Sequence, residues 1–195
     1  CIISTIFVLS VAYSMSRMRF KMRKPFMNIA MIIGLFPSFM SMIAVYYILR
    51  ALNLADGAMI RVALIIVFSA GSGAGFYVAK GFFDTISKSL DEAAIIDGAT
   101  RWNVFTKVTV PLSKPIIVYT ILTSFMGPWV DFIFGKVICR ADAQYYTVSI
   151  GLWKMLEKEY IDSWYTCFAA GAVVVSIPIA ILFLMTQKFY VEGMS

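Results

Sequence analysis

The stretch that decides the fold reads DTISKSLDEAAIIDGATRWNVFTKVTVPLSKP and covers residues 84–115. It is polar and lies between long apolar runs, so we expect it to lie outside the bilayer, on one face of a membrane. Ser89 and Glu92 have the spacing of a capping box and predict the start of a short helix, with Ser87 as the other candidate cap. The segment is therefore expected to begin with a helix at a membrane surface.

A glycine divides this segment into two parts. Gly98 can end the first helix, because glycine takes a left-handed conformation without a Cβ penalty. Thr100 can cap a second short helix that extends through Val108. Pro111 and Pro115 then mark the return of the chain to the membrane. The sequence predicts a helix, a glycine turn and a second helix.

The same residues resemble the EAA loop of ABC importer permeases. The matching positions share a fixed spacing and are Glu92, Ala93, Ala94, Gly98, Val108, Val110 and Pro111. The family form has Ile and Leu where this chain has Val108 and Val110. Further positions that match the carbohydrate-importer version are Asp97, Ala99, Phe105 and Pro115. A long pattern of this kind is more specific than a short motif; the alternative is an ordinary amphipathic loop between two spans.

The resemblance implies that this loop is a coupling helix, which docks in a cleft of a separate ATPase subunit. The residues that it assigns to this contact are Glu92, Ala93, Ala94, Asp97 and Gly98. The implied fold is an all-α integral membrane protein with a MetI-like ABC importer transmembrane bundle. The implied domain covers residues 1–195, with the EAA coupling loop at about 84–115. Because such sugar permeases typically have six spans, we expect the chain to be truncated at its N-terminus.

The composition also indicates a membrane protein. Of the 195 residues, 61% are hydrophobic and 14% are charged, whereas soluble domains are about half apolar and about a quarter charged. The net charge of +6 could indicate nucleic-acid binding. The Lys and Arg residues, however, cluster beside apolar runs, as the positive-inside rule describes. We therefore expect contact with membrane lipid and no nucleic-acid partner.

The residue types argue against chemistry on this chain. There is no histidine, the commonest general base and metal ligand. The cysteines, which have neither metal nor disulfide spacing, are Cys1, Cys139 and Cys167. No Walker lysine motif is present. Asp131 and Asp142 could be read as the carboxylate pair of an intramembrane enzyme, but no motif holds them together. We expect no catalytic residue, cofactor or metal, and ATP hydrolysis on a separate chain.

Hydropathy predicts four full spans after part of an earlier one. The partial span covers residues 1–15, and the full spans are expected at 26–49, 59–79, 116–138 and 164–186. Basic clusters at 17–24 and 80–114 place these two segments on the cytoplasmic side. Prolines that we expect to kink or interrupt spans are Pro37, Pro128 and Pro178. The small residues at 69–75 favour close helix packing over a phosphate loop.

The span at 116–138 contains the candidate groups for a substrate path. Asp131 is an ionisable group at membrane depth or at the outer boundary, and such groups usually face a bundle interior or a wet cavity. The aromatic residues around it, which offer stacking surfaces for sugar rings, are Phe125, Trp129 and Phe132. Aromatic residues at helical spacing more often serve packing. The alternative for Asp131 is an outer-boundary carboxylate that is hydrated or paired with Lys136.

Taken over the whole chain, the resemblance implies one permease subunit of an ATP-driven importer, closest to the maltose/maltodextrin type. Such a subunit forms half of the translocation pore for a sugar in the bacterial inner (plasma) membrane, which it crosses several times. The implied partners are a second permease in a heterodimer, two ATP-binding subunits and an extracellular sugar-binding protein. A permease for a polyol, glycerol phosphate or an amino acid remains open. A purely structural membrane subunit would not need the helix, glycine and helix between two spans.

Overall fold

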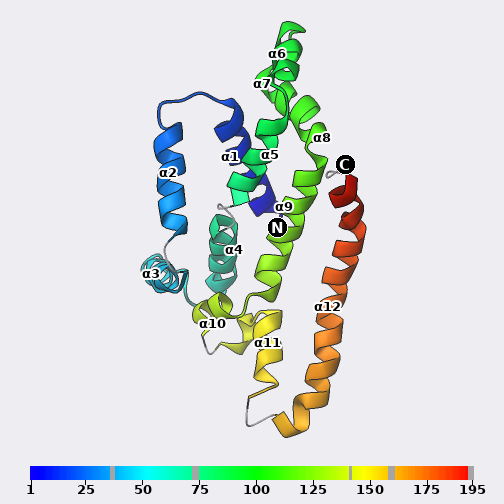
Figure 1. Cartoon of the computed structure of the whole chain (residues 1–195). Helices are drawn as coiled ribbons and strands as arrows, with labels where there is room; N and C mark the ends of the chain where they lie inside the picture. Colours follow the sequence, from blue (N-terminus) through cyan, green and yellow to red (C-terminus); the bar gives the residue numbers. More distant parts are fainter. Residues whose placement is uncertain (36–37, 72–74, 141, 158–160, 193–195) are drawn as a thin grey trace. The chain divides into compact units, whose positions relative to one another are not determined.

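A computed structural model describes residues 1–35, 38–71, 75–140, 142–157 and 161–192 of the chain. These residues form helices joined by turns, and none of them lies in a β-strand. The all-α prediction is therefore confirmed. The chain divides into two compact units, one made of residues 1–35, 69–124 and 186–195 and the other of residues 36–68 and 125–185. Figure 1 shows the helices in chain order from blue to red.

The first unit contains the polar segment and three of the helices that precede it in the chain. These helices are α1 (Ile2–Arg17), α2 (Arg23–Gly34) and α5 (Phe76–Thr85). The polar segment forms α6 (Lys88–Ile96), α7 (Arg101–Asn103), the π-helix η2 (Val104–Thr109) and α8 (Val110–Leu112). α9 (Lys114–Val130) begins in this unit and ends in the other.

The second unit contains the remaining helices. They are α3 (Ser38–Ala51), most of α4 (Met59–Gly71), α10 (Ile133–Cys139), the short η3 (Ala143–Tyr145), α11 (Val148–Lys154) and most of α12 (Ile161–Glu192). Its core is formed where α3, α4, α10 and α11 bring apolar side chains together. The most deeply buried of these are Ala63, Ile138, Cys139 and Ile150.

The core of the first unit is the contact between α1 and α5, which lie side by side. Ala12 of α1 and Ala79 of α5 are both fully buried, and small residues of this kind let two helices approach closely. Phe83 fills the same core near the end of α5. Gly75, directly before α5, lies so close to α1 that a Cβ there would be 3.9 Å from the methyl carbons of Val8. The packing of α5 on α1 fixes the C-terminal end of α5, where the polar segment begins.

The first two full spans predicted from hydropathy each correspond to two helices. The predicted span at 26–49 covers most of α2 and α3, and the one at 59–79 covers α4 and the start of α5. Pro37, which we expected to kink the first of them, lies outside the described residues. Residues 72–74 of the small-residue run also lie outside them. Both spans therefore appear as shorter helices on either side of these residues.

The last two predicted spans differ from each other. The one at 116–138 is divided, because α9 ends at Val130, two residues after Pro128, and α10 begins at Ile133. The one at 164–186 lies within α12, which continues through Pro178.

Among the described residues, one helix, Asp162–Phe189, is long and apolar enough to cross a membrane. There are two if Arg101–Leu112 and Lys114–Val130, bent by 83°, form one span. The divided spans fail this test because each part is shorter than the roughly 20 residues that a bilayer requires.

Candidate functional site

The first helix of the polar segment, α6, begins two residues earlier than the capping-box spacing suggests. The hydroxyl of Ser87 accepts a hydrogen bond from the backbone N–H of Ser89 at 3.3 Å, so Ser87 is the N-cap. The first choice of cap, Ser89, was wrong, and the second candidate is confirmed. Because the helix starts at Lys88, its first turn contains Asp91, and Glu92 lies just beyond that turn.

Gly98 ends α6 as predicted. Its φ is +84°, in the left-handed region that favours glycine. The N–H of Ala99 donates to the carbonyl of Ala94 at 2.9 Å, and the N–H of Gly98 donates to that of Ile95 at 3.0 Å. These two bonds form a Schellman motif. No described atom lies within 4 Å of a Cβ built on Gly98. Within this chain, glycine is therefore required for its backbone conformation and not to make space for a neighbour.

The second helix begins at the predicted cap. The hydroxyl of Thr100 accepts a hydrogen bond from the N–H of Asn103 at 3.2 Å. After this first turn the helix widens into the π-helix η2 and then continues as α8. The bend of 83° into α9 falls at Ser113, a fully buried residue between Pro111 and Pro115. The chain therefore bends between the two prolines that we expected to mark its return to the membrane.

The two helices leave apolar side chains uncovered. Their exposed fractions are Leu90 45%, Ile95 53%, Ile96 85% and Trp102 70%. Of the five residues assigned to ATPase contact, Glu92, Ala93, Asp97 and Gly98 are exposed and Ala94 is half-buried. The structure therefore places all five on α6 and its C-terminal turn, beside exposed apolar residues. Apolar patches rimmed by charged residues are typical of protein interfaces.

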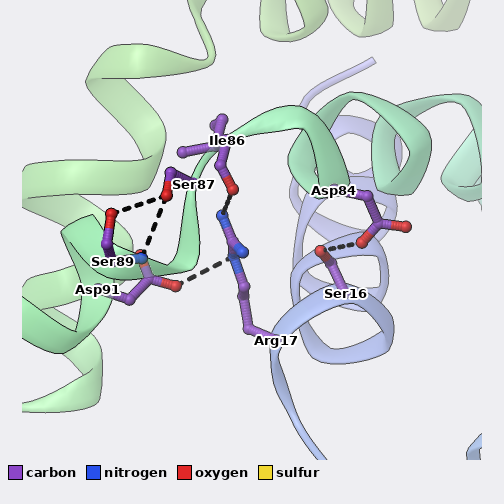
Figure 2. Close-up of polar contacts among 7 residues, drawn as sticks. All are labelled: Ser16, Arg17, Asp84, Ile86, Ser87, Ser89 and Asp91. Atoms are coloured by element: carbon purple, nitrogen blue, oxygen red, sulfur yellow. Dashed lines mark hydrogen bonds and ion pairs between the residues drawn. The ribbon is translucent and has the colours of Figure 1, made fainter.

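A second set of contacts holds α6 against the end of α1 (Figure 2). Nε of Arg17 lies 3.1 Å from Oδ2 of Asp91, and Nη2 of Arg17 donates to the carbonyl of Ile86 at 2.9 Å. The side chains of Arg17 and Asp91 are only 5% and 14% exposed. Our sequence reasoning missed this ion pair, because it used Arg17 only as part of a basic cluster that indicates topology. The one sequence feature that pointed to a role for Asp91 was its position in the first turn of the helix.

Asp84 joins the end of α5 to the end of α1. Its carboxylate accepts hydrogen bonds from the hydroxyl of Ser16 at 2.6 Å and from Nζ of Lys80 at 2.5 Å. Burial alone would raise the pKa of the Asp84 carboxyl. The hydrogen bonds from Lys80 and Ser16 and the positive charges of Lys80 and Arg23 outweigh burial, so the pKa lies below its ordinary value of 3.8. Asp84 is therefore held ionised between α1 and α5.

A pocket of about 320 Å³ lies between the end of α1 and the helices α6 and α7. Its charged lining residues are Arg17, Arg19, Arg23, Lys88, Arg101, Asp91 and Glu92. Positive charges outnumber negative ones, as expected for the cytoplasmic side of a membrane protein. Both partners of the ion pair thus line the same pocket as the other basic residues.

The candidate substrate-path residues lie in the second unit. The indole N–H of Trp129 donates to the carbonyl of Val175 at 3.1 Å, and the ring stacks on Phe125 with centroids 5.2 Å apart. Trp129 and Phe132 both line an apolar pocket of about 500 Å³, together with Trp153 of α11. The structure thus brings three of the four candidates together as packed aromatic side chains. Their role in a substrate path stays a prediction.

Asp131 has a local role. Its Oδ2 accepts a hydrogen bond from the backbone N–H of Gly135 at 2.7 Å, at the start of α10. Lys136, which we considered as its partner, instead places Nζ 3.9 Å from Glu157 and 5.2 Å from the centre of the Phe132 ring. The carboxylate of Asp131 therefore satisfies one of the unpaired amides at a helix start.

Comparisons with known sequences agree with this arrangement. Residues 6–193 match the family described as binding-protein-dependent transport system inner membrane component. The chain is 34% identical over 193 residues to the galactooligosaccharides transport system permease protein GanQ of Bacillus subtilis (strain 168), across 98% of this chain and 66% of that protein. It is 33% identical to the maltose/maltodextrin transport system permease protein MalG of Vibrio vulnificus (strain YJ016), across 94% and 62%. The chain spans just under two thirds of the length of these curated relatives.

A solved structure has the same fold. It is the crystal structure of a bacterial ABC transporter involved in the import of the acidic polysaccharide alginate. One of its chains aligns with a TM-score of 0.78 and 26% identity, over 97% of this chain and 69% of that chain. The family match extends over nearly the whole sequence, and the polar segment has the helix, glycine and helix expected for the EAA loop. The chain belongs to the family of binding-protein-dependent transport system inner membrane components.

Proposed function

We propose that this chain is a permease subunit of an ATP-driven importer and forms half of a translocation pore for a sugar. Support comes from the family and from relatives whose names assign them to galactooligosaccharide and maltose/maltodextrin transport. The substrate class that these relatives favour is an oligosaccharide. ATP hydrolysis then lies on a separate chain, and the permease acts as a lever and a gate in the bacterial inner membrane.

The observation that carries this proposal is the exposed surface of the polar segment. Ile96 and Trp102 are 85% and 70% exposed, and Glu92 is exposed one turn before Ile96. The ends of these helices are closed by hydrogen bonds within the segment. A rigid projection with an apolar tip and a nearby charge suits a cleft in a partner protein. We assign this surface to the contact with the ATPase, and the residues that make it are Glu92, Ala93, Ala94, Asp97 and Gly98.

The connection from this surface to the membrane is short and stiff. α7, η2 and α8 follow one another without a loop, and only the buried Ser113 separates α8 from α9. A movement imposed on the segment by closing ATPase subunits would therefore reach α9 directly. The further partners in this proposal are a second permease, two ATP-binding subunits and an extracellular sugar-binding protein.

The test uses two substitutions in the surface, Glu92→Lys and Gly98→Val. Glu92→Lys reverses a charge at the contact, and Gly98→Val forces a branched residue into a left-handed conformation. Both variants should insert into the membrane. Both should release or uncouple the ATPase, so that ATP-driven uptake of labelled maltotriose or a labelled galactooligosaccharide falls about tenfold or more.

Matched controls separate this effect from general damage. Glu157→Lys makes the same charge change on an exposed side chain of the second unit. Gly81→Val makes the same change at a helical glycine whose added Cβ would meet no described atom within 4 Å. Both controls should keep at least half of the parental uptake. If the two test variants copurify with the ATPase and transport at the parental rate, the coupling role is wrong. If ATP drives uptake of glycerol phosphate or a polyol but of neither sugar, the sugar assignment is wrong and the permease assignment stands.

A further inference from the structure

One guanidinium group joins the end of α1 to the start of α6 (Figure 2). We propose that Arg17 is a positioning residue for coupling, which makes α1 move together with α6 when the ATPase pulls or pushes on that helix. This goes beyond docking, because Arg17 belongs to neither the exposed surface nor the candidate substrate path. It rests on the proposed function, since coupling has meaning only for an ATP-driven transporter.

Arg17 contacts two groups, which lie on either side of the N-cap residue Ser87 in the sequence. Nε lies 3.1 Å from Asp91 in the first turn of α6, and Nη2 donates at 2.9 Å to the carbonyl of Ile86, just before the cap residue Ser87. A planar guanidinium can hold two acceptors at once in a fixed relation, whereas the single ammonium of lysine acts as a point charge. Arg17 therefore holds the start of α6 through one ion-pair contact and the residue before the N-cap through one hydrogen bond, from two different directions.

The covalent chain supplies no such link. α6 follows α5 in the sequence and leads through α7, η2 and α8 into α9, so among the described residues its link to α1 is made by side-chain contacts. The residue before Arg17, Ser16, donates to Asp84 at the end of α5. Two successive residues of α1 thus hold both ends of the turn between α5 and α6. The backbone connects α6 to α5 and α9. With these side-chain contacts, a displacement of α6 is also transmitted to α1.

A location on the cytoplasmic side does not by itself explain the ion pair between Arg17 and Asp91. The positive-inside rule is satisfied by solvated charges such as that of the exposed Arg19. Arg17 is instead only 5% exposed and its partner Asp91 14% exposed. Removing two charges from water is costly, and here the cost is not fully offset, because Nε and Nη1 of Arg17 and Oδ1 of Asp91 have no hydrogen-bond partner among the described residues. A pair that is this deeply covered and that bridges two helices indicates a requirement for a defined position.

The experiment uses the full complex in proteoliposomes, with labelled maltotriose as the transport probe. The variants are Arg17→Gln, Arg17→Lys, Asp91→Asn and the double variant, and Arg19→Gln is the matched control. Three quantities are measured: ATPase subunit retained per permease, ATP hydrolysed per assembled complex, and sugar transported per ATP.

We expect Arg17→Gln and Asp91→Asn to retain the ATPase, because the exposed surface is unchanged. The ratio of sugar transported to ATP hydrolysed should fall about tenfold, within the range that residues coupling two sites produce. Arg17→Lys keeps the charge but can hold only one of the two contacts of Arg17, so its ratio should fall about threefold. The double variant should be no worse than the worse single variant, since both remove one interaction. Arg19→Gln should keep the parental ratio.

Other results would contradict the role of Arg17 or the proposed function. If Arg17→Gln only lowers the amount of assembled complex and each complex keeps the parental ratio, Arg17 has a structural role and the inference is wrong. If Arg17→Gln does not assemble, Arg17→Lys decides the matter, and a parental ratio in that variant overturns the inference. If the parental complex shows no ATP-driven uptake of any solute, the proposed function itself is wrong, which is a different result from a working transporter that is insensitive to Arg17.

Discussion

Asp84 is a carboxylate shared by α1 and α5, and its ionisation should link the stability of the first unit to pH. Its pKa is lowered in the folded protein. The stability that it contributes is therefore fully present above the unfolded pKa of about 4 and is lost as pH falls through the lower folded value. Asp84→Asn should remove this part of the pH dependence. The measurement is the thermal midpoint of the purified protein in detergent between about pH 6 and pH 3.

The control for this prediction is Asp162→Asn, which removes an exposed carboxylate from α12 in the second unit. It should leave the decline of the midpoint below pH 4 close to the parental one. Identical curves for the parental protein and Asp84→Asn would contradict the role of Asp84.

Residues differ in how far the sequence could predict them. Gly98 and Thr100 were predicted because a left-handed turn and a helix cap depend on neighbours within a few residues. The choice between Ser87 and Ser89 failed because both satisfy the same local rule. Arg17 and its distant acceptors could not be paired, because their contact follows from the packing of α1 on α5, which no spacing in the sequence shows.

At the scale of elements, the start of α6 depends on Ser87. Ser87→Ala should destabilise the first turn by about 1 kcal/mol, because the amide of Ser89 loses its acceptor. Ser89→Ala removes only a hydroxyl that lies 2.7 Å from that of Ser87 and should cost less. Hydrogen exchange at the amides of residues 88–91 measures both effects. Faster exchange in Ser89→Ala than in Ser87→Ala would show that the original capping-box assignment was right.

The helices themselves were predicted better than their ends. Hydropathy averages over about 20 residues, so it located the apolar segment at 116–138 but not the division within it. That division lies at Asp131, whose carboxylate accepts a hydrogen bond from the amide of Gly135 in the first turn of α10. A single carboxylate inside an apolar run changes such an average little. The π-helix η2 was not predicted, because an additional residue in a helical turn has no strong sequence signature.

For the whole molecule, the basic clusters predict which segments face the cytoplasm. In a variant without Cys1, Cys139 and Cys167, a cysteine placed at Asn53 or Asp142 should react with an impermeant maleimide added to intact cells. A cysteine at Lys88 should react only after the membrane is opened. All three positions are exposed on the subunit, so burial within it does not explain a difference.

Labelling at position 88 from outside would reverse the predicted orientation and remove the polar segment from contact with any cytoplasmic ATPase. At this scale the sequence was most informative, because the pattern from Glu92 to Pro111 identified a family that the match over residues 6–193 confirms. Solute and partners were not predictable in the same way, because they depend on surfaces of other proteins.

The closed ends of the polar segment have a consequence for the kinetics of assembly. Ser87, Gly98 and Thr100 satisfy the helix ends within the segment, and Arg17 holds it in place, so it does not need a partner to fold. Its association should therefore incur little ordering entropy, in contrast to a disordered peptide that folds on binding. Such a preorganised ligand can dissociate from and return to its receptor cleft without refolding in each cycle.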